Sequence, residues 1–407
     1  MKEKRTIQST QLMPSTRGRF RPIRALKPES LARMLDAFHF GDLRQAALTW
    51  DAIQRRDDVL QGVASKRKKA VARLGWEVLT LDDSEEAMQH KEALEYFYNN
   101  LTATHACDDN ERGGFALLVK QMMDAVGKKY AVHEIVYEFE QGESRHEYPK
   151  LRATFRFVPL WFFENKTGRL RFLKEEGASE GKSLEEDAWL ITTGDGLMEA
   201  CSIAYLFKHL PLRDWLVYCE RNGMPGVKGV TDATPGSAEW EVARQAVEDF
   251  GAEFHALMSR GSDIQPIDLT TSGELPYPRL IERMDRAMIA LWRGADLSTL
   301  SSTGGMGASL QQSESDLLED DDALMISETL NAQIDRVVLK TLFGVERGKA
   351  YIRLKVRDRR DRKEDLELCR TLWQMGVPLA LEDLRERFGI SAPDADETLI
   401  DKKETLS

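Results

Sequence analysis

The sequence lacks long apolar runs and paired cysteines. No stretch of about 18 consecutive apolar residues occurs, which argues against a transmembrane helix. The basic first residues lead into a polar stretch, so no signal peptide is expected. The four cysteines, Cys107, Cys201, Cys219 and Cys369, are widely spaced and form no CxxC pair. This spacing predicts reduced thiols and a protein that folds in the cytoplasm.

Positive charge is scarce outside the N-terminal segment. The whole chain has a formal net charge of −11, whereas residues 1–28 carry +7, so the remainder carries −18. An acidic body argues against tight sequence-independent binding of DNA, which requires many basic contacts to phosphates. It is compatible with DNA that passes through a channel without being gripped. Residues 1–27 are predicted to be a flexible basic arm, with docking onto an acidic partner or nucleic acid as the alternative.

Recognisable catalytic motifs are also missing. Residues 177–183 read GASEGKS, with three residues between the glycines where a phosphate-binding loop needs four. His133 and Glu134 begin like a zinc-protease motif, but Tyr137 stands where the second histidine is required. No GxSxG elbow occurs in the serine-rich stretch at 298–315. We therefore expect no catalytic site, no metal and no cofactor.

Three runs of charge are interpreted as surface features. The acidic run EDDD at 319–322 cannot converge on one ion, because consecutive helical residues point in different directions. The basic run KRKK at 66–69 occupies one helical turn, and a solvated face is predicted for both runs. The mixed run RDRRDRK at 357–363 favours ion pairs between subunits over a DNA-binding patch.

Periodicity divides the first half of the chain into a helical part and a β part. Apolar residues at helical spacing predict helices through most of 28–128, with Asp57 and Asp58 capping one of them and a strand at 76–81. From 130 to 192 the period becomes two, and Leu151, Ala153 and Phe155 alternate with polar residues. The expected fold class is α+β, mainly helical, with an antiparallel β patch.

The second half is predicted to contain two long helices that bracket a small βαβ insert. The first helix spans 197–221, with Pro211 expected to kink or split it. The insert spans 224–270, with strands at 227–230 and 264–269. The remaining expected elements are the second long helix at 279–293, a polar glycine-rich loop at 298–312, a helix at 315–343, a strand at 351–356, and helices at 361–375 and 380–387.

Several short motifs in this order resemble the family of Mu-like phage portal proteins. The strongest is the run YLFKH at 205–209, LRDW at 212–215 and ERNGMP at 220–225. Others are RLGWEV at 73–78, GRLRF at 168–172, GGMGAS at 304–309, GVP at 376–378 and RFGI at 387–390. Together they cover roughly residues 30–390. Pro211 departs from the small, helix-compatible residue that the family usually has there.

The resemblance implies a ring oligomer with wing, stem, clip, tunnel loop and crown around an axial channel. Its regions would be the wing at 28–195, stem helices at 196–223 and 273–297, the clip at 224–272 and the tunnel loop at 298–314. The residues at 315–390 would supply a tunnel-side helix, a wing strand and a short crown, and 391–407 would be a disordered tail.

The same resemblance implies three groups of functional residues. The DNA-facing tunnel loop would contain Ser301, Ser302, Thr303, Gly304, Gly305, Met306, Gly307, Gln311 and Gln312. The clip surface that docks the motor would contain Glu239, Trp240, Arg244, Glu248 and Glu253. The stem would pack through Leu206, Leu210, Trp215, Leu280, Met284, Met288 and Leu291.

The implied partners are about twelve copies of the chain itself, double-stranded DNA passing without sequence specificity, the terminase large subunit, the major capsid and scaffold proteins, and head-tail adaptor proteins. No membrane partner is expected. The implied location is the capsid vertex of a virion assembled in the host cytoplasm. Two alternatives remain open, a non-portal structural or scaffolding protein and a nucleotide-hydrolysing enzyme that uses Lys182.

Overall fold

The computed structural model describes residues 26–140, 150–174, 178–223, 227–250, 255–258, 275–294, 305–356 and 362–388. The chain divides into two compact units, Met1–Lys355 and Val356–Ser407. The boundary falls inside residues 315–390, which were predicted from the sequence to form one region. The strand near 350 belongs to the first unit because it pairs with an N-terminal strand of that unit, Trp76–Thr80.

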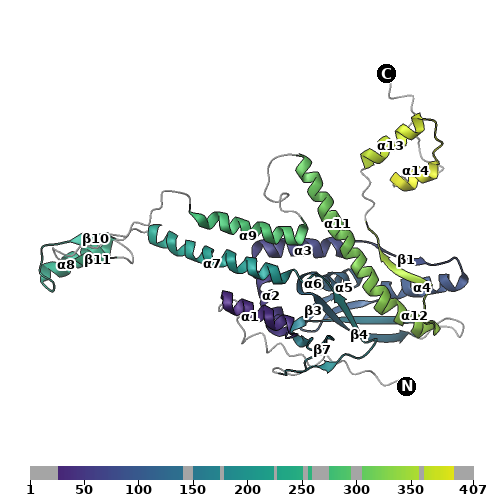
Figure 1. Ribbon diagram of the computed structural model, residues 1–407, viewed down its shortest axis with the longest axis horizontal. Coiled ribbons are helices and arrows are strands. Elements are labelled where there is room, and N and C mark those ends of the chain that lie inside the picture. Colours follow the sequence, from purple (N-terminus) through teal and green to yellow (C-terminus); the bar gives the residue numbers. More distant parts are fainter. Residues whose placement is uncertain are drawn as a thin grey trace. The chain divides into compact units, whose positions relative to one another are not determined.

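Helices make up most of the described chain, and Figure 1 labels most of them. The helices of the first unit are α1 (Pro28–His39), α2 (Arg44–Arg56), α3 (Asp58–Ala72), α4 (Glu85–Asn99), α5 (Phe115–Met122), α6 (Asp124–Lys128), α7 (Met198–Gly223), α8 (Ala238–Phe250), α9 (Pro276–Arg293), α11 (Gly305–Leu330) and α12 (Arg336–Phe343). The described helices of the second unit are α13 (Arg362–Gln374) and α14 (Leu381–Phe388). Among the described helices, none is both long enough and apolar enough to cross a membrane.

The described strands form one larger mixed sheet and three small ones. They are β1 (Trp76–Thr80), β2 (Thr102–His105), β3 (Asp108–Gly113), β4 (Tyr130–Glu140), β5 (Lys150–Val158), β6 (Phe163–Glu164), β7 (Arg171–Phe172), β8 (Lys182–Ser183), β9 (Trp189–Thr193), β10 (Val227–Val230), β11 (His255–Met258) and β12 (Ala350–Leu354). The larger sheet has the order β3-β2-β5-β4-β9. Two of the small sheets pair β1 with β12 and β10 with β11, and the third has the order β6-β7-β8.

The larger sheet confirms the α+β prediction and corrects one detail of it. In β5, Leu151, Ala153 and Phe155 are buried whereas Arg152 is exposed, as the alternation predicted. The sheet is mixed rather than purely antiparallel, because β2 pairs in parallel with β5. Strands β2 and β3 were not predicted, since the polar residues of β3 show no apolar alternation.

The helix α3 begins where the sequence predicted. The Asp57 side chain accepts a hydrogen bond of 2.9 Å from the backbone N–H of Leu60, which satisfies one of the open donors of the first turn. One side of the helix is then buried, through Leu60, Val63, Ala64, Arg67, Lys68 and Val71, and α2, α5, α9 and α11 all pack against it. This position makes α3 the platform on which the long helices rest.

The long helices α7 and α9 lie side by side and antiparallel (Figure 1). Cys201 of α7 contacts Trp292 near the end of α9, whereas Lys208 further along α7 contacts Asp285 earlier in α9. The helix α9 ends at Gly294, whose φ of +76° is a left-handed conformation that glycine adopts without strain.

The helix α7 does not split at Pro211, so one of the two outcomes predicted there, a kink or a split, was wrong. The helix is continuous over 26 residues, or about 39 Å at 1.5 Å per residue. Proline removes one backbone donor from the helix. The neighbouring residues Leu206 and Lys208 are buried against the body, and this packing holds the helix together on the N-terminal side of Pro211.

Between α7 and α9 the chain forms the predicted βαβ module. Strands β10 and β11 pair in parallel, with Val227 beside His255, and the helix α8 connects them. The second strand expected at 264–269 lies outside the described residues, and the strand that pairs with β10 is instead β11.

The helix α11 begins earlier than predicted. Residues 305–314 were assigned to a polar loop, but the structure makes them helical from Gly305 onward. The helix-forming residues Ala308, Leu310, Gln311 and Gln312 explain this difference, because they extend the helix toward its N-terminus. The predicted single helix at 315–343 is also interrupted, by a π-helical turn at Asn331–Asp335.

The π-helical turn is fixed to two sheets. The Gln333 amide accepts a hydrogen bond from the backbone N–H of Ile191 and donates one to its carbonyl, at 2.9 and 2.8 Å. The Asp335 carboxyl group accepts hydrogen bonds from the Tyr98 hydroxyl and from the backbone N–H of Ile352, at 2.5 and 2.8 Å. The C-terminal end of α11 is therefore held firmly on the body.

Candidate functional site

A lysine in the middle of α7 attaches the two long helices to the platform helix. The Lys208 ammonium lies 2.9 Å from Asp57, 3.1 Å from Asp58 and 2.7 Å from Asp285, so it joins α7 to α9 and to the start of α3. Its side chain is only 7% exposed. His209 adds a fourth polar contact, at 3.3 Å from Asp57.

Burial and hydrogen bonding compete in setting the charges of this lysine cluster. Burial alone would raise the pKa of Asp57, but hydrogen bonds from His209, Leu60 and Lys208 outweigh it and lower the pKa to about 2. Burial alone would lower the pKa of Lys208, yet its bonds to Asp285 and Asp57 raise it above the usual range. Asp57 and Lys208 therefore stay ionised at neutral pH.

A second buried ion pair fixes α11 on α3. Arg67 contacts Asp322 through two parallel hydrogen bonds, of 2.7 and 2.9 Å, and also donates to the Trp292 carbonyl of α9 at 3.3 Å. This two-pronged contact fixes orientation as well as distance. It corrects two predictions, because Arg67 and Asp322 belong to charge runs that were expected to face solvent.

A third cluster joins α3 to the short helix α6. Asp124 lies between Lys68 and Lys128, at 2.6 and 2.7 Å, and Lys128 also pairs with Asp51 of α2. Both lysine side chains are buried, so Lys68 is a further correction to the expected solvated face. The two ammonium groups outweigh burial and hold the pKa of Asp124 below its usual value.

The face of α7 that points away from the body carries exposed apolar residues. Ile203 and Phe207 lie one helical turn apart and Val217 follows ten residues later on the same side; they are 41%, 48% and 40% exposed. Leu216, on another side of the helix, is 60% exposed. They were not among the residues predicted for stem packing. Their spacing can be read from the sequence. The sequence does not show which apolar face of the helix would be exposed to solvent.

The residues predicted for stem packing differ in how deeply they are buried. Leu206 and Met288 are buried in the body. Leu280 is 40% exposed, and the others are half-buried: Leu210, Trp215, Met284 and Leu291. The deepest part of α9 is made by Met288, Ile289 and Trp292, so the packing stripe is rotated from the expected one.

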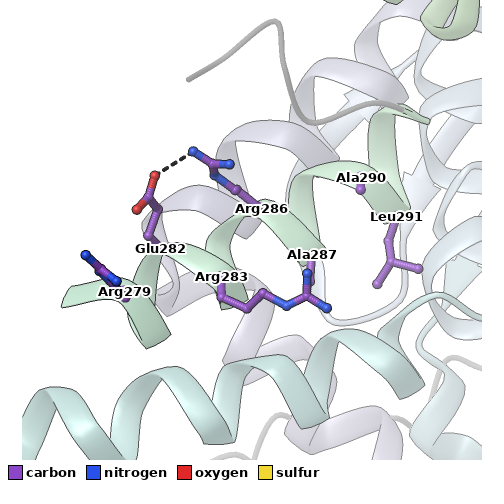
Figure 2. A pocket seen from close by; sticks show the side chains of 7 residues that line it. All are labelled: Arg279, Glu282, Arg283, Arg286, Ala287, Ala290 and Leu291. Atoms are coloured by element: carbon purple, nitrogen blue, oxygen red, sulfur yellow. Dashed lines mark hydrogen bonds and ion pairs between the residues drawn. The ribbon is translucent and has the colours of Figure 1, made fainter. Parts of the chain in front are cut away.

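A groove lies along the outer face of α9 (Figure 2). It is lined by Arg279, Glu282, Arg283, Arg286, Ala287, Ala290 and Leu291. Figure 2 also shows the ion pair between Arg286 and Glu282, at 2.7 Å. These arginines were not among the predicted functional residues, although their spacing of four and three residues places them on one helical face.

The two sequence motifs that resemble a zinc-protease motif and a phosphate-binding loop lie in surroundings that do not fit those sites. His133 lies on β4 and is fully buried, and burial lowers its pKa to about 3. Lys182 lies on the short strand β8, where no helix begins to receive a phosphate. Within the described residues, no group of three or more histidine, cysteine, aspartate or glutamate residues could hold a metal ion.

Comparison with known families decides the relationship. The model of the family described as portal protein of Mu bacteriophage matches residues 48–390. That match covers most of the chain. This chain belongs to the Mu portal protein family.

Two curated relatives of this portal-family chain are distant in sequence, and they come from a Mu-like prophage and from phage Mu. The chain is 21% identical over 307 residues to the Mu-like prophage FluMu protein gp29 of Haemophilus influenzae, covering 70% of this chain and 55% of the relative. It is 23% identical over 291 residues to the portal protein of Escherichia phage Mu, covering 68% and 53%. The chain thus spans about half the length of these curated relatives.

Two solved chains are similar to this chain at a low level. One comes from the neck of an empty GTA particle computed with C6 symmetry, and it covers 84% of this chain and 93% of its own length. The other comes from the neck of a native GTA particle computed with C12 symmetry, with 91% and 96% covered. Both superpose with a TM-score of 0.49 at 12% identity.

The residues that the portal resemblance assigned to the tunnel loop fall into two groups. Ser301, Ser302, Thr303 and Gly304 lie outside the described residues. Gly305, Met306, Gly307, Gln311 and Gln312 lie in the first turns of α11, so their assignment to a loop was wrong. Whether this region faces DNA stays a prediction.

The residues assigned to the clip lie mostly on α8. Glu239, Trp240, Arg244 and Glu248 belong to this helix, and Arg244 pairs with Glu241 at 2.8 Å. Glu253 lies outside the described residues. The helix therefore presents acidic and basic groups together, and its docking role stays a prediction.

Proposed function

We propose that this chain is the subunit of a portal ring, closed by identical head-to-tail contacts around a channel for double-stranded DNA. The observation that carries the proposal is the exposed apolar stripe of Ile203, Phe207 and Val217 on a long helix whose other side is fixed by buried ion pairs. Apolar side chains in such a row are stabilised when a second surface covers them. In a portal ring that surface is the neighbouring subunit.

The regions of the ring follow from this assignment. Helices α7 and α9 form the stem, and the module of β10, α8 and β11 forms the clip, which docks the terminase large subunit and later the head-tail adaptor proteins. The helical and β layers before α7 form the wing, which meets the major capsid and scaffold proteins. Residues 298–304 and the first turns of α11 face the channel, and α13 and α14 form the crown.

The subunit is proposed to act without chemistry of its own. The acidic body, at −18 outside residues 1–28, repels phosphates and lets DNA slide rather than bind. The energy for packaging then comes from the motor protein that docks on the clip. The ring, with about twelve subunits, assembles in the host cytoplasm and becomes the capsid vertex of the virion.

Negative-stain electron microscopy of the purified full-length chain tests the proposal. Ring particles with a central hole are expected at more than one salt concentration. Phe207→Asp is expected to abolish them, because it places a charge in the apolar contact. Phe139→Asp is a matched control, since Phe139 of β4 is 54% exposed and lies outside the stem helices. A strictly monomeric wild-type chain under all salt conditions would overturn the proposal.

The channel assignment has a separate test. Deleting residues 299–303 leaves the helix α11 complete from its first residue, Gly305. The variant is expected to form rings of normal size and to lose DNA retention in a packaging assay. Normal retention would remove this segment from the DNA-facing surface while leaving the ring itself in place.

A further inference from the structure

The solvent face of α11 carries acidic groups and leucines in a regular row. Glu314, Leu317, Asp321, Leu324 and Glu328 follow one another at intervals of three and four residues, and all five are exposed. Both leucines are 57% exposed. Such spacing places the five side chains along one helical stripe, in the manner of a seam that packs against another helix. We call this set the acidic leucine stripe.

The stripe is strongly negative because nothing on its own helix neutralises it. The sequence of α11, Gly305–Leu330, contains no lysine or arginine. Within the described part of the chain, Glu314, Asp321 and Glu328 form no ion pair. Asp322, in contrast, points inward and is neutralised by Arg67. The outward acids therefore need a positive partner from elsewhere.

The groove on α9 has the complementary chemistry. Its three arginines, Arg279, Arg283 and Arg286, outnumber its one acid, Glu282, which pairs with Arg286, so the groove is net positive. Ala287 and Ala290 leave room for larger side chains (Figure 2). Small residues on a helix face allow a second helix to approach closely. We call this surface the arginine groove.

We propose that the acidic leucine stripe of one copy of this chain packs into the arginine groove of the neighbouring copy. The contact rests on the proposed ring function and names one interface of that ring. Leu317 and Leu324 lie over the alanines of α9, while the acids pair with the arginines on either side.

The spacing of the charges supports this pairing. Successive acids, such as Glu314 and Asp321, are seven residues apart, and so are Arg279 and Arg286. At 1.5 Å per residue, both intervals are about 10.5 Å along their helix axes. Two neighbouring acids therefore meet two arginines when the helices lie nearly parallel or antiparallel, and Arg283 lies between them.

The contact is expected between copies rather than within one copy. Within the chain, α11 meets the end of α9 mainly through other residues: the Ser315 hydroxyl donates to the Arg293 carbonyl, and Leu318 lies against Gly294. These residues lie on a different face of α11 from Leu317. Of the stripe, Glu314 at its N-terminal end also lies near Gly294. Because stripe and groove are different surfaces, their contact is head-to-tail, and a head-to-tail contact that repeats with a fixed rotation closes a ring.

A cross-link formed only between different chains tests the geometry. One chain carries Ala287→Cys and the other carries Leu317→Cys, both in a Cys219→Ser background that removes an exposed native thiol. Mixing the two chains under oxidising conditions is expected to yield a disulfide between residues 287 and 317, identified by mass spectrometry. Replacing Ala287→Cys by Ala32→Cys, on the exposed face of α1, is expected to give none.

A charge swap tests the electrostatics. Arg283→Glu and Asp321→Arg should each reduce the ring fraction at low salt roughly tenfold or more, because like charges then face each other at every interface. The double variant should recover rings. Arg33→Glu on α1 is the matched control and should behave as the wild type.

The outcomes separate this inference from the proposed function. Rings from the wild type together with unchanged rings from both single variants and no 287–317 cross-link would overturn the contact and leave the portal ring intact. Absence of rings from the wild type at every salt concentration would overturn the proposed function and the contact with it.

Discussion

Removing the Lys208 ammonium group should destabilise the first unit substantially. In Lys208→Met the apolar stem of the side chain is retained and the charge is lost. The buried Asp57, whose side chain is 0% exposed, and Asp285, at 22%, then lose their cation. Asp58 is 88% exposed, so water replaces its contact at little cost.

The magnitude follows from the burial of the two remaining acids. Removing one partner of a buried ion pair costs about 3–5 kcal/mol, because the other charge is left in a poorly solvated place. His209 still contacts Asp57, at 3.3 Å, and compensates in part for the lost hydrogen bond. We therefore expect a loss at the lower end, about 3 kcal/mol of unfolding free energy.

Urea unfolding of the monomer, followed by tryptophan fluorescence, measures this loss. Lys208→Arg keeps the positive charge and should lose much less. Lys69→Met removes an exposed lysine of α3 and should change the unfolding free energy by less than about 0.5 kcal/mol. If Lys208→Met cost no more than Lys69→Met, the lysine cluster would not hold α7 on the platform.

The pH dependence of the same comparison gives a second check. Asp57 has a pKa of about 2 in the folded chain instead of 3.8, so its stabilising contribution is present above pH 4 and is lost as the pH falls through 2. The deficit of Lys208→Met should be constant between pH 5 and 7 and should shrink below pH 4. A deficit independent of pH down to 2 would contradict the ionic explanation.

Three further predictions concern single sites. Pro211→Ala should raise the unfolding free energy, by at most about 3 kcal/mol, because alanine restores a donor for the Phe207 carbonyl; a lower melting temperature by circular dichroism would contradict this. Burial raises the pKa of Cys201 to about 12, so in the unassembled chain iodoacetamide at pH 8 should label the exposed Cys219 and leave Cys201 unmodified, as measured by mass spectrometry. Burial raises the pKa of Asp335 to about 7, so the wild type should lose stability relative to Asp335→Asn as the pH rises from 4 to 7, and a constant difference in urea midpoints would refute that assignment.

Local patterns in the sequence were sufficient for the elements that depend on local physics. The Asp57 cap, the alternation in β5 and the two long helices were all predicted, because capping and burial of one face leave a periodic signal. The family resemblance was predicted from short motifs and is confirmed by the family match at residues 48–390.

The sequence failed where partners are distant along the chain. Arg67 and Asp322 are separated by 255 positions, and Lys68 and Asp124 by 56, so each charge looked unpaired in its own neighbourhood. The prediction that charged runs face solvent was therefore wrong for three of these four residues, namely Arg67, Lys68 and Asp322. The early start of α11 was missed for a different reason, since its glycines and serines hid the helix-forming residues that follow.

The three buried ion clusters share a property that bears on ring assembly. Each joins the platform helix α3 or the residue that caps it to another helix: Lys208 reaches it from α7, Asp322 from α11 and Asp124 from α6. A buried ion pair adds little net stability over an apolar contact of equal volume, but it is strongly directional. Apolar faces alone would let α7 and α11 slide or rotate on α3.

In a closed ring the same angular error repeats at every subunit and prevents closure, so we infer that these ion pairs are used for orientation more than for stability. The exposed stripes of α7 and α11 can serve as interfaces because the opposite sides of the same helices are fixed in this way.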